Sequence, residues 1–344
     1  MMDPDLLLEK PAVMSDDLFY GEFEEMFEGF RRTMTLKTAV DSGLFAHTRE
    51  AATASDIGRI LGWDDVMTRM FLDCLVETGF LIEEGGAYRN SEKTAIYLDP
   101  ASPRYQGAGL ENTFIRLMRW LSLSDFLKNG PSVVPTSEVF GERWIRAIGE
   151  SALGGGIAKT VAFVAEHVDI PDEGTFLDLG GGHGLYTVAF CRRFPGLKGA
   201  VFDKPEMTRI AEEMFSSYGC DASTIPGDFY VDPLGGPYDV LFSSFNHSTS
   251  DSSLCEKVSG AVRPGGLLIM RRHVRSGPPK AYAVMEWNLV IREGIEKGKQ
   301  TFRGSWLPTS EEYIERMEGL GMNMLAREDL GDGSEIVIMR RPRP

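Results

Sequence analysis

The second half of the chain alternates short apolar runs with amphipathic segments, and this pattern limits the fold more than any other feature. After Pro171 the apolar runs cover residues 175–179, 200–202, 239–242, 267–270 and 335–339. Runs of this length, separated by helical segments, are typical of a doubly wound parallel sheet with helices on both faces. We therefore expect an α/β, Rossmann-like domain over residues 171–344.

The first hundred residues have a mainly helical pattern. Helices are expected over residues 53–62 and 64–78, and Glu83-Glu-Gly-Gly86 joins two short apolar runs as a β-hairpin. Helices followed by a hairpin describe a winged helix over residues 1–100. The helix that would enter DNA carries one Arg69 against four acids, Asp64, Asp65, Asp73 and Glu77. Because phosphate binding needs the opposite charge, we expect no nucleic-acid partner and favour a structural or dimerising role.

Composition indicates a cytoplasmic protein. The net charge of −15 keeps a chain soluble and repels nucleic acid. The four cysteines are scattered without CxxC spacing, which fits reduced thiols better than disulfides or a zinc site. No apolar run approaches the ~20 residues that cross a bilayer, and the N-terminus has no signal-peptide pattern. We expect no membrane association.

A glycine-rich loop follows the first apolar run and opens a helix. It reads Asp178-Leu-Gly180-Gly-Gly182-His-Gly184, with the spacing D-x-G-x-G-x-G. Glycines allow a sharp turn and the close approach of backbone N–H groups to a ligand. The spacing differs from the G-x-G-x-x-G of dinucleotide-binding proteins and suits S-adenosylmethionine, which has no pyrophosphate.

Two acids extend this predicted cofactor site. Asp203 ends the second strand, 21 residues after Gly182, where a carboxylate can accept hydrogen bonds from both ribose hydroxyls. Asp228 follows the third strand and can bind the adenine amino group, while Phe229 packs on the ring. Together with Asp178 and Gly180, these residues form an ordered set that predicts an S-adenosylmethionine site.

The order of these motifs resembles a known family. The segments LDLGGGHG, FP, FDKPEM, GDF and RPGGLLI are similar to those of the small-molecule O-methyltransferases of plants and bacteria. In that family a winged-helix dimerisation domain precedes a class I methyltransferase domain. The resemblance implies a homodimer whose N-terminal helices interlock, and the aromatic stripe from Phe19 to Phe30 fits this expectation. Residues 101–170 are then a helical region that lines the active site.

The resemblance also implies a general base. His247 follows the fourth strand, at the place of the family's catalytic histidine, and a histidine is suited to taking a hydroxyl proton near neutral pH. Ser248 and Thr249 replace the family's Asp and Trp neighbours. Ser243 replaces a common lysine and is counted among the expected cofactor contacts.

One departure concerns the acceptor. The family's glutamate that orients the histidine falls on Arg272, and a second glutamate has no clear counterpart in residues 297–303. A guanidinium would lower the basicity of a nearby histidine but can bind a carboxylate or phosphate. We therefore expect Arg272 to bind the acceptor, although either Arg271 or Arg272 could face the pocket. The remaining expected acceptor contacts are Trp120, Phe163, Met285, Glu286 and Asn288.

Several reactions fit these residues. O-methylation with His247 as base is the principal expectation. S-methylation of a carboxylate-bearing thioether of the methylthiohydroxybutyrate type needs no base and would use an arginine to hold the acid. C-methylation and a non-catalytic, cofactor-binding regulator are further alternatives. Because no paired carboxylates follow the fourth strand, we expect no metal.

Overall fold

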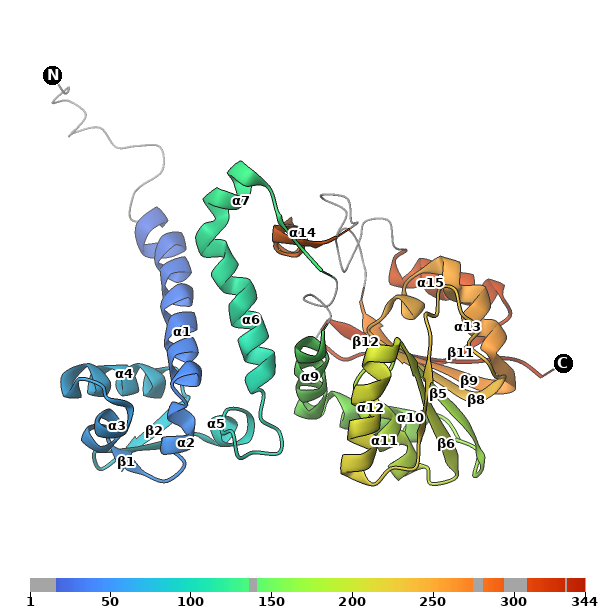
Figure 1. The fold of residues 1–344 in the computed structure, drawn as a ribbon, viewed down its shortest axis with the longest axis horizontal. Coiled ribbons are helices and arrows are strands. Elements are labelled where there is room, and N and C mark those ends of the chain that lie inside the picture. The colour runs from blue at the N-terminus through green and yellow to red at the C-terminus, as the bar shows by residue number, and fades with distance from the viewer. Residues whose placement is uncertain (1–16, 136–140, 275–280, 294–307, 332, 344) are drawn as a thin grey trace, which may run out of the picture. The chain divides into compact units, whose positions relative to one another are not determined.

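A computed structural model describes residues 17–135, 141–274, 281–293, 308–331 and 333–343 (Figure 1). The chain forms two compact units, Met1–Gly107 and Ala108–Pro344. The structure divides the chain once, after Gly107. The expected three regions, 1–100, 101–170 and 171–344, remain a prediction.

The first unit has the expected helices and hairpin. Thr53 caps α3 by accepting a hydrogen bond from the Asp56 N–H, and the Asp64 carboxylate caps α4 through Val66 and Met67. Side-chain caps of this kind satisfy N–H groups that the first helical turn leaves unpaired. The elements are η2 (Asp17–Phe23), α1 (Glu24–Asp41), α2 (Leu44–His47), β1 (Ala52–Thr53), α3 (Ala54–Leu61), α4 (Asp65–Glu77), β2 (Leu81–Glu84), β3 (Ala87–Asn90) and α5 (Glu92–Tyr97).

The second unit contains a seven-stranded sheet in the order β11-β12-β9-β8-β5-β6-β7. Its strands are β5 (Gly174–Leu179), β6 (Leu197–Asp203), β7 (Ser223–Pro226), β8 (Tyr238–Ser244), β9 (Val262–His273), β11 (Asn323–Asp329) and β12 (Ser334–Arg340). The expected α/β, Rossmann-like fold is confirmed, and β5 to β9 are parallel. The parallel expectation is wrong for the last apolar run, because β12 lies antiparallel to both β9 and β11. Only four residues of the chain separate β11 from β12, too few for the crossover that parallel pairing needs.

Helices cover both faces of this sheet. Leu177 and Leu179 face a cluster that includes α13 (Cys255–Ala261) and α15 (Ser310–Gly319). Phe176, on the opposite face, packs with α10 (Ile157–His167) and α11 (Leu185–Arg193). Burial on both faces explains why the central strands are continuously apolar. The other elements are α6 (Gly107–Arg119), η3 (Trp120–Ser122), α7 (Leu123–Asn129), β4 (Ser132–Val134), α9 (Glu142–Ser151), η4 (Ala152–Gly156), α12 (Pro205–Tyr218), η5 (His247–Thr249), η6 (Ser252–Leu254), α14 (Ala281–Leu289) and β10 (Val290–Arg292).

Candidate active site

A pocket of about 1100 Å³ lies at the carboxyl ends of the parallel strands. Ligands of open α/β sheets bind at this edge, outside the strand ends. The glycine loop after β5, Asp203 at the end of β6, Asp228 after β7 and His247 after β8 all line this pocket. This volume lies just above the ~300–1,000 Å³ that is usual for a small-molecule pocket.

The glycine loop turns with backbone angles that favour glycine. Gly180 has φ +69° and Gly182 has φ +49°, both in the left-handed region. A Cβ atom at Gly180 would collide with the side-chain amide of Asn246. The Gly182 N–H donates a hydrogen bond of 2.8 Å to Asp203 Oδ2. The loop therefore needs glycine at 180 both for its turn and for the space beside Asn246.

The acids of the predicted cofactor site lie together on the pocket wall. Asp178 is buried and accepts a 3.0 Å hydrogen bond from Thr187 Oγ1, and burial raises the pKa of its carboxyl to about 7. Burial also raises the pKa of Asp203, although the N–H groups of Lys204 and Gly182 partly oppose this effect. The structure brings both acids to the pocket with Asp228 and Phe229.

Ser243 is not among the residues that line this pocket. Its side chain is buried and donates a 3.0 Å hydrogen bond to the Leu179 carbonyl, and its Oγ lies 2.7 Å from Ser248 Oγ. These contacts tie β8 to β5 and to the turn that carries His247. The following residue, Ser244, lines the pocket instead, because neighbouring strand residues face opposite sides.

His247 begins η5, directly beyond β8, and lines the pocket. Its Nδ1 lies 2.7 Å from the hydroxyl oxygen of Tyr230, which in turn donates a 3.1 Å hydrogen bond to Asp251 Oδ2. Burial lowers the pKa of His247 below its ordinary value of 6.5; Asp251 opposes this shift and Arg292 adds to it. The imidazole is therefore neutral at pH 7 and can accept a proton.

Phe245 connects β8 with the turn at His247. It has φ 53°, a strained value for an aromatic residue and one that is typical of functional sites. Its ring lies 4.7 Å from the His273 ring and 4.9 Å from the Arg271 guanidinium. Phe245 thus contacts two side chains of β9, Arg271 and His273, that line the same pocket.

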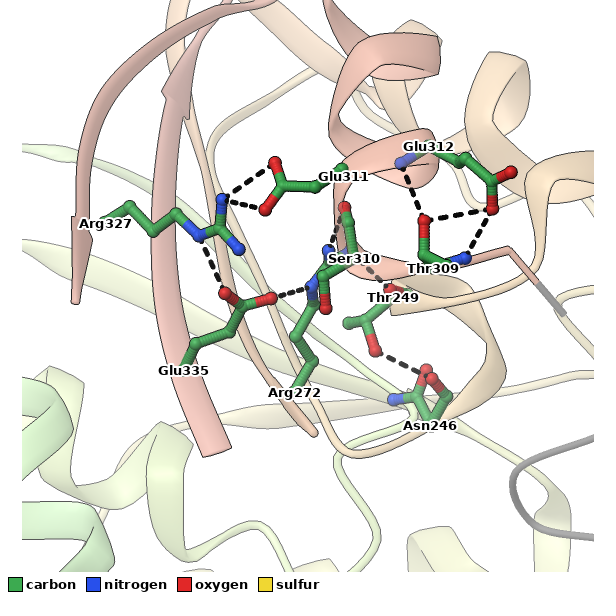
Figure 2. Close-up of polar contacts among 9 residues, drawn as sticks. All are labelled: Asn246, Thr249, Arg272, Thr309, Ser310, Glu311, Glu312, Arg327 and Glu335. Atoms are coloured by element: carbon green, nitrogen blue, oxygen red, sulfur yellow. Dashed lines mark hydrogen bonds and ion pairs between the residues drawn. The ribbon is translucent and has the colours of Figure 1, made fainter. Parts of the chain in front are cut away.

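Arg272 is not among the residues that line this pocket. Figure 2 shows the polar contacts that it makes instead. It is 3% exposed and lies opposite Glu335 in the β9–β12 register. Its Nε donates to Glu335 Oε1 at 2.8 Å, and its other nitrogens donate to the carbonyls of Thr249 at 3.0 Å and Ser310 at 2.5 Å.

A second arginine completes this charged network. Glu335 Oε2 accepts a 2.7 Å hydrogen bond from Arg327 Nε, and Arg327 also pairs with Glu311. Burial would raise the pKa of Glu335, but the two arginines hold it below its ordinary value. Arg272 therefore joins β9, β12, η5 and α15. It also lines a small neighbouring pocket that shares His247 and His273 with the large one, so its contact with the acceptor stays a prediction.

Arg271 points the other way and lines the pocket. It is 6% exposed, and its Nη1 donates a 2.5 Å hydrogen bond to the hydroxyl of Tyr186. A side chain at position 156 would collide with this guanidinium, so Gly156 provides the space that it occupies. Of the two candidate arginines, the structure places Arg271 in the pocket.

The remaining expected acceptor contacts lie away from the pocket lining. Glu286 accepts hydrogen bonds from Arg116 Nε at 2.8 Å and Trp120 Nε1 at 3.3 Å, so these residues join α14 to α6 and η3. Asn288 Nδ2 donates to the Val284 carbonyl at 2.7 Å. The two other expected contacts are Met285, half-buried on α14, and Phe163, buried in the core against His167.

Several pocket residues were not predicted. Among them are Tyr186, Tyr230, Phe245, His273, Trp287 and Arg292. For His273 a signal was present, because strand alternation places residues 271 and 273 on one face. For the others the sequence offers neither a motif nor a spacing.

Two classes of feature are absent from the described part of the chain. Among these residues, no cluster of His, Cys, Asp and Glu could hold a metal ion. Of the helices that the structure describes, none is long and apolar enough to cross a membrane.

Known protein families and individual proteins resemble this chain. A model of the O-methyltransferase domain matches residues 156–306, and a model of the O-methyltransferase dimerisation domain matches residues 24–100. An uncharacterized protein of Methanocaldococcus jannaschii is 29% identical over 341 residues, covering 95% of this chain and 90% of that protein. The 3-hydroxy-5-methyl-1-naphthoate 3-O-methyltransferase of Streptomyces sahachiroi is 26% identical over 284 residues, covering 78% and 82%.

The fold is shared with solved methyltransferases. Human N-acetylserotonin methyltransferase, solved in complex with S-adenosylmethionine, superposes with a TM-score of 0.71 at 22% identity, covering 96% of this chain and all of that one. Both family models describe O-methyltransferases, and the glycine loop is typical of the same class of protein. The chain therefore belongs to the O-methyltransferase family that carries an N-terminal dimerisation domain, and it is an S-adenosylmethionine-dependent methyltransferase.

Proposed function

We propose that the protein transfers a methyl group from S-adenosylmethionine to a hydroxyl oxygen of a small-molecule acceptor, with His247 as general base. The observation that carries this proposal is that His247 lines the same pocket as Gly180, Gly182 and Asp203. A base and a cofactor loop on one pocket wall allow donor and acceptor to meet without a large rearrangement.

The cofactor would occupy the part of the pocket formed by β5, β6 and β7. The backbone of Gly180 and Gly182 would hold its amino-acid end, Asp203 its ribose hydroxyls, and Asp228 with Phe229 its adenine. These residues fit such a ligand, because Gly182 adds no side chain to the pocket wall that it shares with Asp203 and Asp228. The bound cofactor supplies an activated methyl group on a positively charged sulfur.

His247 would remove the hydroxyl proton as the methyl group moves. The oxygen–carbon bond forms, the sulfur–carbon bond breaks, and the proton passes to His247. A neutral imidazole is required, and the burial that lowers the pKa of His247 keeps it neutral at pH 7. The pocket walls would align the acceptor with the methyl group. Such alignment would be the largest contribution to the rate besides proton removal.

The test is a pair of measurements on His247→Ala. Turnover should fall by ~10²–10⁴-fold, while the Kd of S-adenosylmethionine measured by calorimetry stays within about threefold. His47→Ala, an exposed change in the first unit, is the matched control. A loss of turnover below about threefold would refute the base.

The positive charges in the pocket favour an acceptor that carries a carboxylate group. Arg271 and Arg292 line the same pocket as His247, and guanidinium groups bind carboxylates well. The Streptomyces sahachiroi relative is named for a hydroxylated aromatic carboxylate. S-methylation of a thioether acid is the second candidate, because it would use the same cations and need no base.

Arg271→Met separates an acidic acceptor from a neutral one. The KM for hydroxynaphthoic acids should rise about tenfold or more, as expected for a lost charged hydrogen bond, while the KM for the matching naphthols stays constant. An unchanged KM for the acids would remove this part of the proposal.

We further propose that the protein is a homodimer. Met26, Phe27 and Phe30 on α1 are each at least half exposed in the single chain, and they lie within the matched dimerisation domain. A face of large apolar side chains is typical of an interface. Sedimentation of the full chain should give twice the mass of 38.1 kDa, and Phe27→Glu should shift it toward the monomer.

A further inference from the structure

Tyr230 and Asp251 meet at His247 from separate segments. Tyr230 follows β7, and Asp251 lies between η5 and η6. The Tyr230 hydroxyl oxygen is 2.7 Å from His247 Nδ1 and 3.1 Å from Asp251 Oδ2, and the tyrosine ring meets the imidazole edge-on at 6.2 Å. We infer that Tyr230 and Asp251 form a positioning relay that keeps the proton of neutral His247 on Nδ1. This inference rests on the proposed function, in which His247 is the base.

The direction of the hydrogen bonds follows from the single hydroxyl proton. A carboxylate can only accept, so the contact between Tyr230 and Asp251 requires the tyrosine to donate. The Tyr230 oxygen then accepts from His247, which places a proton on Nδ1. If Tyr230 instead donated its proton to His247, it would lose the hydrogen bond to the Asp251 carboxylate. A hydrogen bond to a charged acceptor is stronger than one to a neutral imidazole nitrogen. Nε2 is left unprotonated and is the nitrogen that can take the acceptor's proton.

Both members of the relay have the protonation states that it needs. Burial would raise the pKa of Asp251, but hydrogen bonds from Ser253 and Tyr230 outweigh this effect and hold the pKa below its ordinary value. Burial and the nearby Asp251 raise the pKa of Tyr230 well above its ordinary value. At neutral pH, therefore, Asp251 is ionised and Tyr230 keeps its proton.

Asp251 is also fixed in place. Its Oδ1 accepts hydrogen bonds from Ser253 N at 2.9 Å and Ser253 Oγ at 2.7 Å, which leaves Oδ2 for Tyr230. Its own N–H donates to the His247 carbonyl at 2.7 Å and closes the turn between them. Tyr230 is held less firmly because it is 44% exposed, although the Asp228 carboxylate accepts a 2.9 Å hydrogen bond from its N–H.

The relay supplies a carboxylate that is missing at position 272. Arg272 is tied to Glu335 and is not available to orient His247. Once His247 is protonated, Asp251 stabilises the positive charge through Tyr230, whereas Arg292 opposes it. Among the described residues, Tyr230, Asp251 and Arg292 are thus the charged and titratable groups that act on the imidazole.

Nitrogen NMR of the full chain labelled with ¹⁵N-histidine tests the relay without an acceptor. The chain has five histidines, and His247→Gln assigns the signal of interest. The wild type should show protonated Nδ1 and unprotonated Nε2. Tyr230→Phe and Asp251→Asn should move the proton toward Nε2, while Tyr218→Phe, an exposed tyrosine on α12, should change nothing. Protonated Nε2 in the wild type, or an unchanged tautomer in both variants, would overturn the relay.

Kinetics then separate the relay from the base. Tyr230→Phe and Asp251→Asn should lower kcat by about 10–100-fold with an unchanged Kd for S-adenosylmethionine, since orientation of a base contributes part of the ~10²–10⁴-fold that it supplies. Asp251→Asn should also move the acid limb of the pH profile downward, because Asp251 raises the pKa of His247. If the tautomer moves but kcat does not, the base role fails and the relay stands. If His247→Ala is inactive but the tautomer never moves, the base stands and the relay fails.

Discussion

The two ends of the pocket are built in different ways. The part near the glycine loop uses bare backbone at Gly180 and Gly182 and acids at the ends of neighbouring strands. The other part uses side chains from β9, α14 and β10, and its cationic members are Arg271 and Arg292. One end is thus acidic and local in sequence, whereas the other is basic and assembled from distant segments.

This difference fits the ligand proposed for each end. A cofactor shared by a whole family is held by strand ends and turns, which any sequence with the same glycines can form. An acceptor differs from protein to protein, so its contacts come from side chains that can change without disturbing the sheet. Arg271 and Arg272 show this contrast within two residues, since one lines the pocket and the other stabilises the fold.

Arg272→Met should have the largest effect on stability. It leaves Glu335 buried with one arginine instead of two, and breaking a buried ion pair in this way costs about 3 kcal/mol. Urea denaturation measures the loss. Arg316→Met, which breaks an exposed pair with Glu256, should cost less than about 1 kcal/mol. Equal losses would show that Arg272 is not a structural residue.

Asp203→Ala should weaken cofactor binding by about 10–100-fold, the value of one or two hydrogen bonds to a charged group. The change also removes the acceptor of the Gly182 N–H, so the loop loses a support. Calorimetry with S-adenosylmethionine measures the effect, and Asp221→Ala, a change at an exposed loop residue, is the control. Unaltered affinity would contradict the placement of the cofactor at the acidic end.

The pH dependence of kcat tests the basic end of the pocket, and the expected change is smaller than those above. His247 must be unprotonated, and burial lowers its pKa, so activity should fall only as the pH drops below about 6.5. Arg292 lowers this pKa further. Arg292→Gln should therefore move the acid limb to higher pH, by a fraction of a unit, and a shift to lower pH would contradict the proximity of this charge to the base.

The acidic end was predictable because its signals are local. The glycine loop, Asp203 and Asp228 follow successive strands, and parallel strands bring their carboxyl ends to one edge. The basic end depends on register and on contacts between distant elements. The pairing of Arg272 with Glu335 arises from antiparallel β12, which the alternation pattern had predicted to be parallel. Tyr230 meets His247 only through the fold, 17 residues away in the chain.

The most direct test of the account is the identity of the methylated atom. The protein is incubated with S-adenosylmethionine carrying a ¹³C-methyl group and, in separate reactions, with hydroxynaphthoic acids, naphthols and methylthio-substituted hydroxy acids. Carbon NMR distinguishes a methoxy carbon from a methylsulfonium carbon and from a methyl group on carbon. A methoxy product from the hydroxynaphthoic acids that disappears in His247→Ala is the result expected here. A methylsulfonium product that persists in His247→Ala would contradict the proposed base and establish S-methylation instead.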